Sequence, residues 1–142
     1  MNKAKETFNK FIKDPLFGIE LALYWAEGAK KNDRVSFMNS DPEMVKIIVD
    51  WYQKVLATKK EDMHLRLYIH KPYKDENCEE YWADKLDFLL SQFKKTVYKP
   101  TPHSVKKNPD YKGCLRLSIS GIQNLRKVLA WQKLFIKYYN HS

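Results

Sequence analysis

The sequence predicts an α+β fold in which helices cover one face of a β-sheet. Two segments, residues 64–70 and 114–120, alternate apolar and polar side chains, which is the period of a strand with one buried face. Other segments repeat apolar residues every three to four positions, as amphipathic helices do. A chain of 142 residues with 44% hydrophobic content can build one packed core. We therefore expect a single domain over residues 1–142.

The first half of the chain contains signals for two helices. Residues 15–27 are predicted to form the first, because Asp14-Pro15 is a typical helix start and Gly28 a typical helix end. The second follows Ser40-Asp41-Pro42-Glu43, in which the serine and the glutamate have the spacing of a capping box. Its apolar residues recur on one helical face and predict an end near Leu56.

The remaining elements complete the α+β pattern. Residues 34–39 alternate polar and apolar side chains and are predicted to form a strand, and residues 95–99 a short one. Residues 75–90 predict a helix, and a last amphipathic helix is expected to begin after Gly121. The strands share one design, with aliphatic residues on one face and Arg, Ser, Tyr or His on the other. A sheet covered on its aliphatic face would leave a polar, basic face open.

The net charge of +9 is concentrated in the second half of the chain. Residues 91–142 hold 11 Lys and Arg against the single acid Asp110, whereas the first ninety residues hold 15 basic and 16 acidic residues. Such an asymmetry indicates a surface for a polyanion, although a merely solvated basic face would give the same composition. The many aromatic residues among the charges favour nucleic acid as the partner.

Several other classes of protein are disfavoured by the sequence. No apolar run approaches the roughly 20 residues of a membrane span, and the first residues lack the apolar stretch of a secretory signal, so we expect a cytoplasmic protein without membrane contact. Cys78 and Cys114 form no metal-binding pair and are expected to be reduced and buried. The sequence contains neither of the two glycine-rich nucleotide-binding motifs, Gly-x-Gly-x-x-Gly and the Walker-type loop.

The predicted helix at 15–27 has an unusual surface. Gly18, Ala22 and Ala26 are four residues apart and form a ridge of small side chains, along which two helices can approach closely. The rest of this helix is apolar nearly all round, so it must be buried on more than one side. A second copy of the chain can supply that burial, which predicts a homodimer with these three residues at the interface. Packing against an internal helix or the sheet accounts for the ridge equally well.

Glu27 lies at the C-terminal end of this predicted helix, where the helix dipole disfavours a carboxylate. If two such helices pack about a two-fold axis, their Glu27 carboxylates lie close together, and divalent cations would offset the repulsion. Hard oxygen ligands favour Mg²⁺ in that position. The alternative is an exposed glutamate at a frayed helix end.

The segment Leu21-Ala22-Leu23-Tyr24-Trp25-Ala26-Glu27-Gly28, with Gly18 upstream, resembles the motif of the LAGLIDADG homing endonucleases, in which a helix with small packing residues ends in an acid and a glycine. The strand that follows and the helix start at residues 39–43 are similar to the family's second strand and second helix. The resemblance covers residues 15–70, and more loosely the last strand and helix. Trp25 stands where many members have another acid, and the helix at 75–90 looks like an addition.

The resemblance implies a saddle-shaped antiparallel sheet in the DNA major groove, motif helices packed at the centre of a homodimer, and terminal acids that bind catalytic metal ions. Glu27 matches the catalytic, metal-binding acid, so a Mg²⁺-dependent endonuclease for double-stranded DNA is expected. A non-catalytic DNA-binding regulator of the same fold and an RNA-binding or RNA-splicing cofactor remain open. The residues expected to contact DNA are Lys30, Lys31, Arg34, Ser36, Arg66, Tyr68, His70, Lys95, Lys99, Arg116 and Ser118.

Overall fold

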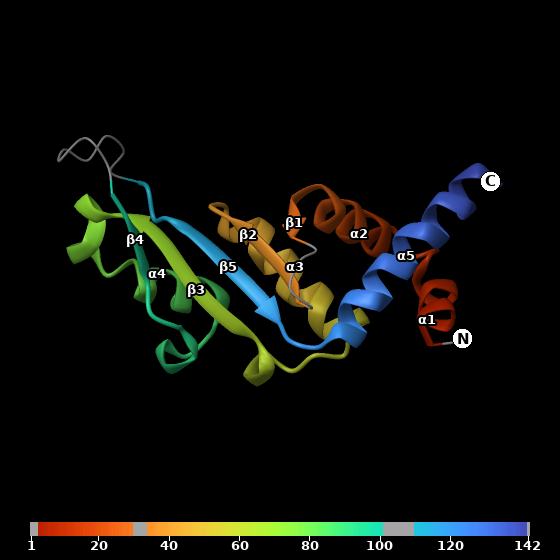
Figure 1. The fold of residues 1–142 in the computed structure, drawn as a ribbon, viewed down its shortest axis with the longest axis horizontal. Helices are drawn as coiled ribbons and strands as arrows, with labels where there is room; N and C mark the ends of the chain where they lie inside the picture. The colour runs from red at the N-terminus through yellow and green to blue at the C-terminus, as the bar shows by residue number, and fades with distance from the viewer. Residues whose placement is uncertain (1–2, 30–33, 101–109, 142) are drawn as a thin grey trace.

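The computed structural model describes residues 3–29, 34–100 and 110–141. Figure 1 shows an α+β arrangement in which the helices gather behind and at one end of a twisted sheet. The α-helices are α1 (Lys3–Phe11), α2 (Pro15–Glu27), α3 (Pro42–Val55), α4 (Cys78–Leu86) and α5 (Ile122–Asn140). The strands are β1 (Gly28–Ala29), β2 (Val35–Asn39), β3 (His64–His70), β4 (Val97–Lys99) and β5 (Cys114–Ile119). Short 3-10 helices are η1 (Lys60–Asp62), η2 (Lys71–Glu76) and η3 (Leu90–Gln92).

The five strands form one mixed sheet in the order β1-β2-β5-β3-β4. The pairs β1–β2, β2–β5 and β5–β3 are antiparallel, whereas β4 pairs with β3 in parallel. The expectation of a wholly antiparallel sheet is therefore wrong at this edge. The connection from β3 to β4 runs through η2, α4 and η3, and this long crossover returns the chain to the sheet in the same direction.

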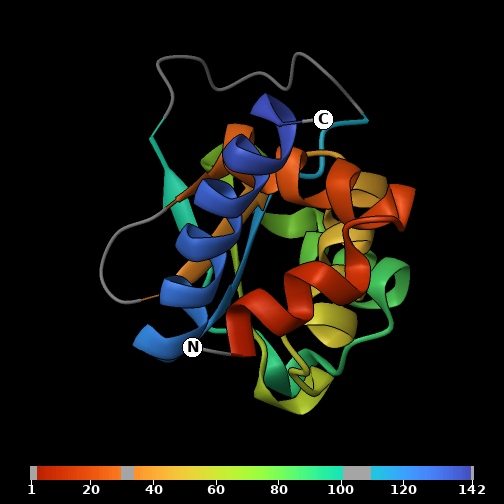
Figure 2. The same ribbon diagram turned by 90° about the vertical axis from the view of Figure 1, so that its right-hand side faces the viewer.

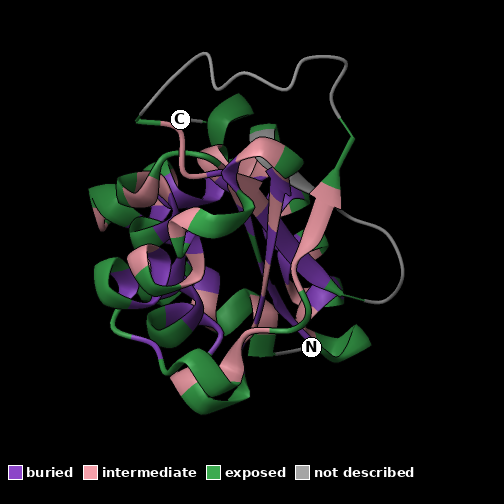
Figure 3. Ribbon diagram, turned by 90° about the vertical axis from the view of Figure 1, so that its left-hand side faces the viewer, coloured by how far each residue is buried: buried purple, intermediate pink, exposed green. Residues whose placement is uncertain are grey.

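One face of the sheet packs against helices, as the alternating sequence predicted. Strand β3 alternates fully buried aliphatic side chains with half-buried polar ones along its whole length. The buried side chains of β2, β3 and β5 join those of α2, α3, α4 and α5 in one core cluster. Figure 3 shows buried residues where the helical layer meets the sheet. The opposite face carries the polar side chains, and no described helix packs across it.

The predicted helix starts are confirmed, with one correction. The Asp14 carboxylate accepts a hydrogen bond from the Leu16 amide at 3.0 Å, so it caps α2 in front of Pro15. The N-cap of α3 is Asp41 rather than Ser40, because the Asp41 carboxylate accepts from the Glu43 amide at 2.9 Å. Aspartate and serine cap equally well, and the sequence places both before the proline.

The helix predicted over 75–90 and the strand predicted over 95–99 are shorter in the structure. Helix α4 ends at Leu86, and Asp87 adopts a left-handed conformation with φ of 58°. The Lys60 ammonium donates hydrogen bonds to the carbonyls of Leu86 at 2.7 Å and Asp87 at 3.1 Å, which satisfies the end of the helix. This contact spans 26 residues of sequence, so local periodicity did not show where α4 ends.

Helix α1 was not predicted, and contacts from distant parts of the chain hold it. It lies beside α5 at the end of the molecule where both termini are found (Figure 2). The Trp131 indole N–H donates a hydrogen bond to the Ala4 carbonyl at 2.9 Å, and the Phe8 ring lies 5.9 Å from that of Phe17. Ala4, Phe8 and Phe11 recur at i, i+4 and i+7 in α1, so the sequence contained a helical signal here that the prediction missed.

Two neighbouring tryptophans provide a test of this arrangement. Trp51 and Trp131 are fully buried with ring centroids 5.8 Å apart, but the Trp51 indole N–H has no partner among the described residues. Replacing Trp131 with phenylalanine removes a hydrogen bond, whereas the same change at Trp51 removes an unsatisfied polar group. We expect Trp131→Phe to lower the free energy of unfolding by about 1–2 kcal/mol more than Trp51→Phe, measured by denaturant titration. Equal losses would contradict the docking role of Trp131.

Candidate nucleic-acid interface

The strand register sets the arrangement of side chains on the open face. One cross-strand row contains Ser36 of β2, Ser118 of β5 and His64 of β3. The next contains Met38, Arg116 and Arg66 in the same strand order. Residues paired across neighbouring strands point to the same face, so two rows on three strands project from one surface. The sequence had predicted the orientation of these side chains but not which of them are neighbours.

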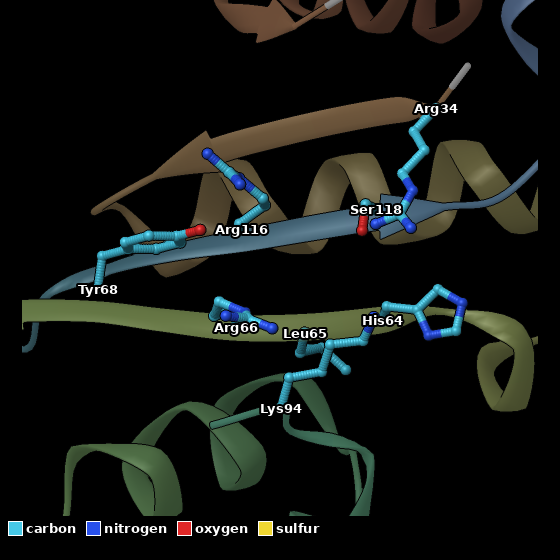
Figure 4. A pocket seen from close by; sticks show the side chains of 8 residues that line it. All are labelled: Arg34, His64, Leu65, Arg66, Tyr68, Lys94, Arg116 and Ser118. Atoms are coloured by element: carbon cyan, nitrogen blue, oxygen red, sulfur yellow. The ribbon is translucent and has the colours of Figure 1, made fainter. Parts of the chain in front are cut away.

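Four residues of these rows, His64, Ser118, Arg66 and Arg116, line a basic pocket of about 220 Å³. Figure 4 shows polar side chains of β3 and β5 on the side of the sheet away from α3, with Arg34 and Lys94 beside them. Arg34, directly before β2, and Lys94, after η3, complete the rim. Among the described residues no acidic side chain lines the pocket, and the residues that do are Arg34, His64, Leu65, Arg66, Tyr68, Lys94, Arg116 and Ser118.

The positive charge of the pocket is not neutralised within the described part of the chain. Arg66 and Arg116 are directly opposite each other on β3 and β5, and like charges in this position destabilise a sheet. Neither arginine forms an ion pair with a described carboxylate. The Arg116 guanidinium instead lies 4.8 Å from the centroid of the Tyr68 ring, within the range of a cation–π contact. The geometry favours an anion between the two arginines.

His64 stands between this basic pocket and a second, more open hollow of about 430 Å³. Burial lowers the pKa of the imidazole below its ordinary value, and the positive charges of Lys94 and Arg34 lower it further, while Asp62 acts in the opposite direction. The His64 Nε2 and the Ser120 hydroxyl oxygen are 3.4 Å apart. The neutral form of His64 is therefore favoured by its present surroundings.

The structure brings five of the eleven expected DNA contacts into the pocket and places four others outside it. Arg34, Arg66, Tyr68, Arg116 and Ser118 line it.

Four of the others lie elsewhere on the sheet or near its edge. Ser36 is buried and does not line the pocket, and its backbone N–H donates to the Tyr24 hydroxyl, so its contact with DNA stays a prediction. His70 packs with its ring centroid 5.8 Å from that of Tyr111, outside the pocket. Lys95 and Lys99 are exposed, and the Lys99 ammonium lies 5.8 Å from the centroid of the Tyr68 ring. Lys30 and Lys31 lie outside the described residues.

Three pocket residues, His64, Leu65 and Lys94, were absent from the expected contacts, and Leu65 belongs to the buried face of β3. His64 begins the most regular strand and faces the same way as Arg66, so its alternation was a signal for the open face. Lys94 had no such signal. Its backbone N–H donates to the Leu65 carbonyl at 2.7 Å, and this non-local bond brings its side chain to the pocket rim.

Helix α2 presents two different faces. Phe17, Leu21 and Tyr24 are buried in the core, together with the carboxylate-bearing Glu20. On the other side Leu16 is 54% exposed and Ile19 60% exposed. The small residues expected at the dimer interface lie on this outer side. Gly18 is half-buried, Ala22 and Ala26 are exposed, and a Cβ atom added at Gly18 would meet nothing within 4 Å. The outer stripe of α2, defined as Leu16, Ile19, Ala22 and Ala26, is therefore apolar and exposed among the described residues.

The expected metal ligand stands at the end of the same helix. Glu27 is the last residue of α2, and the chain passes directly into β1, but its side chain is outside the described part of the structure. Among the described residues, no group of three or more His, Cys, Asp or Glu side chains lies where it could hold a metal ion. A separate finding concerns membranes: none of the described helices combines the length and apolar character that a bilayer span requires.

No family model, no curated protein and no solved structure matches this chain.

Proposed function

We propose that this protein binds specific sites in double-stranded DNA through the open face of its sheet, and that it works as a homodimeric, metal-dependent endonuclease. One observation carries the proposal: Arg34, Arg66, Lys94 and Arg116 converge on a single pocket of that face, and no acidic side chain from the described parts of the chain lines it. DNA offers two kinds of acceptor to such a surface, the backbone phosphates and the guanine edges of the major groove. A β-sheet face can enter that groove.

The arrangement around α2 supports the same proposal. The helix that resembles the LAGLIDADG motif leads directly into a sheet whose far face is open, as that resemblance implies. Its outer stripe is apolar and includes the small residues Ala22 and Ala26, so a second copy can approach closely there. A two-fold axis along this stripe would give two copies of the open face, which suits a palindromic or near-palindromic DNA site.

The proposed dimer also supplies the metal ligands. One chain offers Glu27 and, among the described residues, no further cluster of ligands. Because Glu27 ends the helix that carries the outer stripe, the matching carboxylate would come from the other copy. Oxygen ligands suit Mg²⁺. When bound, the ion would polarise the phosphate and activate a water molecule for hydrolysis.

The decisive experiment is selection and cleavage of a randomised duplex DNA library with and without Mg²⁺, comparing wild type with Glu27→Gln. We expect both proteins to select the same site, and only wild type with Mg²⁺ to cut it. Glu80→Gln, which changes an exposed glutamate on α4, serves as the matched control and should cut like wild type.

The other outcomes identify the alternatives. If both proteins select one site and neither cuts, the chain is a non-catalytic DNA-binding regulator. If duplex DNA is not retained but structured RNA is, the open face serves an RNA-binding or splicing cofactor. Cleavage by Glu27→Gln at the wild-type rate would exclude Glu27 as the catalytic acid.

The dimer is tested by substitutions on the outer stripe of α2. Ile19→Ser removes an exposed apolar side chain and is expected to give a monomeric mass by light scattering at micromolar concentration. Leu89→Ser, at a residue that is 69% exposed beyond the end of α4, is the matched control and should leave the dimer intact.

Gly18→Ala distinguishes an effect on the dimer interface from an effect on the stability of the single chain. Its added methyl group meets nothing within 4 Å in the single chain, so helix propensity should raise the stability of the chain by up to about 1 kcal/mol. In closely packed helices the same methyl group would weaken association, and the dissociation constant of the dimer should rise. A monomeric wild type would contradict the proposed assembly.

A further inference from the structure

We propose that the basic pocket holds one phosphate group between Arg66 and Arg116, and that His64 takes up a proton when the phosphate binds. This inference rests on the proposed DNA-binding function only for the source of the phosphate. The site itself is defined by the pocket, and it makes the occupancy of the open face depend on pH.

The charges and the size of the pocket support a single tetrahedral anion. Three arginines and a lysine line a volume of about 220 Å³, compared with roughly 30 Å³ for one water molecule in the liquid. The pocket can therefore admit a phosphate group with some of its waters, but not a length of duplex. Arg66 and Arg116 repel each other across β3 and β5 when the pocket is empty, and an anion between them would convert this repulsion into two charge-assisted contacts.

His64 is placed to respond to that anion. It lines the same pocket, and the charges near it come from several elements. Lys94 and Arg34 lower the pKa of its imidazole together with burial, and Asp62 opposes them. A bound phosphate would add negative charge beside the ring, offset the two cations and raise the pKa of His64. Protonation and phosphate binding must then favour each other equally. The charged or titratable groups that line the two hollows meeting at His64 are Arg34, Arg66, Tyr68, Lys94, Arg116, Glu61 and Asp62.

The direct test is a proton NMR titration of the His64 ring with pH, in sodium sulfate and in sodium chloride of equal ionic strength. Sulfate is a tetrahedral anion whose charge stays constant over the range, and the chloride series corrects for screening of Lys94 and Arg34. We expect sulfate to raise the pKa of His64 by about one pH unit over chloride. The His70 ring lies on the same face of β3 but outside the pocket, so its resonances serve as an internal reference for an intact sheet.

Matched variants then assign the effect to the pocket. The double variant Arg66→Gln, Arg116→Gln should lose the response of His64 to sulfate, while an unchanged His70 signal reports an intact sheet. Lys95→Gln removes an exposed cation that does not line the pocket and should keep the response. A His64 titration that is the same in sulfate and chloride, or a response that survives the double arginine change, would overturn the proposal.

Two duplexes identify the source of the phosphate. A duplex with 5′-hydroxyl ends carries only internal phosphodiesters, and the same duplex with 5′-phosphates adds terminal monoesters. A rise in the pKa of His64 with the first assigns the pocket to the DNA backbone, and a rise with the second alone assigns it to a strand end. DNA binding without any sulfate response would remove the phosphate site and leave the DNA-binding proposal standing. A sulfate response without DNA binding would leave the phosphate site standing and remove the DNA-binding proposal.

Discussion

Replacing Glu20 with glutamine is expected to raise the free energy of unfolding at about pH 8 by up to about 3 kcal/mol. Glu20 is only 2% exposed, on the core side of α2, and its Oε2 atom has no hydrogen-bond partner among the described residues. Burial raises the pKa of this carboxyl group to about 7, with a further contribution from Asp50, while Lys54 acts in the opposite direction. The ionised form is thus disfavoured in the folded protein.

The direction of the pH dependence follows from the raised pKa. In the unfolded chain the carboxyl group ionises near its ordinary pKa of 4.5, but in the folded chain it keeps its proton up to about pH 7. Between these values the native state holds the extra proton, so stability falls as the pH rises. The contribution of Glu20 to the free energy of unfolding should be most favourable below about pH 4.5 and least favourable above about pH 7.

Denaturant titrations from about pH 5 to about pH 8 test this prediction. The decline in stability across this window should be clear in wild type and largely absent in Glu20→Gln. Glu80→Gln, at an exposed position on α4, controls for the loss of one negative charge and should retain the decline. A wild-type curve that stays flat, or a Glu20→Gln curve that falls in parallel with it, would show that Glu20 does not carry the pH dependence.

Gly113→Ala is expected to lower the free energy of unfolding by about 2–4 kcal/mol, because this position combines backbone strain with a clash. Gly113 has a φ of +84°, and a Cβ atom here would lie 2.7 Å from the Tyr68 carbonyl oxygen and 2.9 Å from the Leu67 Cδ1 atom. The first of these is backbone of β3 and cannot move without disturbing its pairing with β5. Thermal or denaturant unfolding measures the loss.

Gly121→Ala separates the two contributions. Gly121 also has a positive φ, of +110°, but its added Cβ atom would meet only the Asn124 side chain at 3.6 Å. This variant should therefore show the cost of strain alone, about 1 kcal/mol. If both variants lose the same stability, the close approach of Gly113 to β3 contributes nothing.

The elements that the sequence predicted well are those whose signals are local. Strand β3 matches its predicted range of 64–70, because the alternation of its side chains is a direct consequence of one face being buried. Helix α2 matches 15–27, because Asp14-Pro15 sets its start and Gly28 its end. The polar identity of the open face followed from the same alternation. By itself, then, the sequence determined the fold class, most of the element boundaries and which side chains leave the core.

The tertiary structure alone decided which of those side chains meet. The parallel pairing of β4 depends on a crossover through α4, and helix α1 depends on the bond from Trp131 to Ala4. The pocket depends on the register that sets Arg66 opposite Arg116 and on the backbone bond that brings in Lys94. Periodicity specifies the face to which a side chain points, but register and crossover bring together residues far apart in the chain, and no local pattern records that distance.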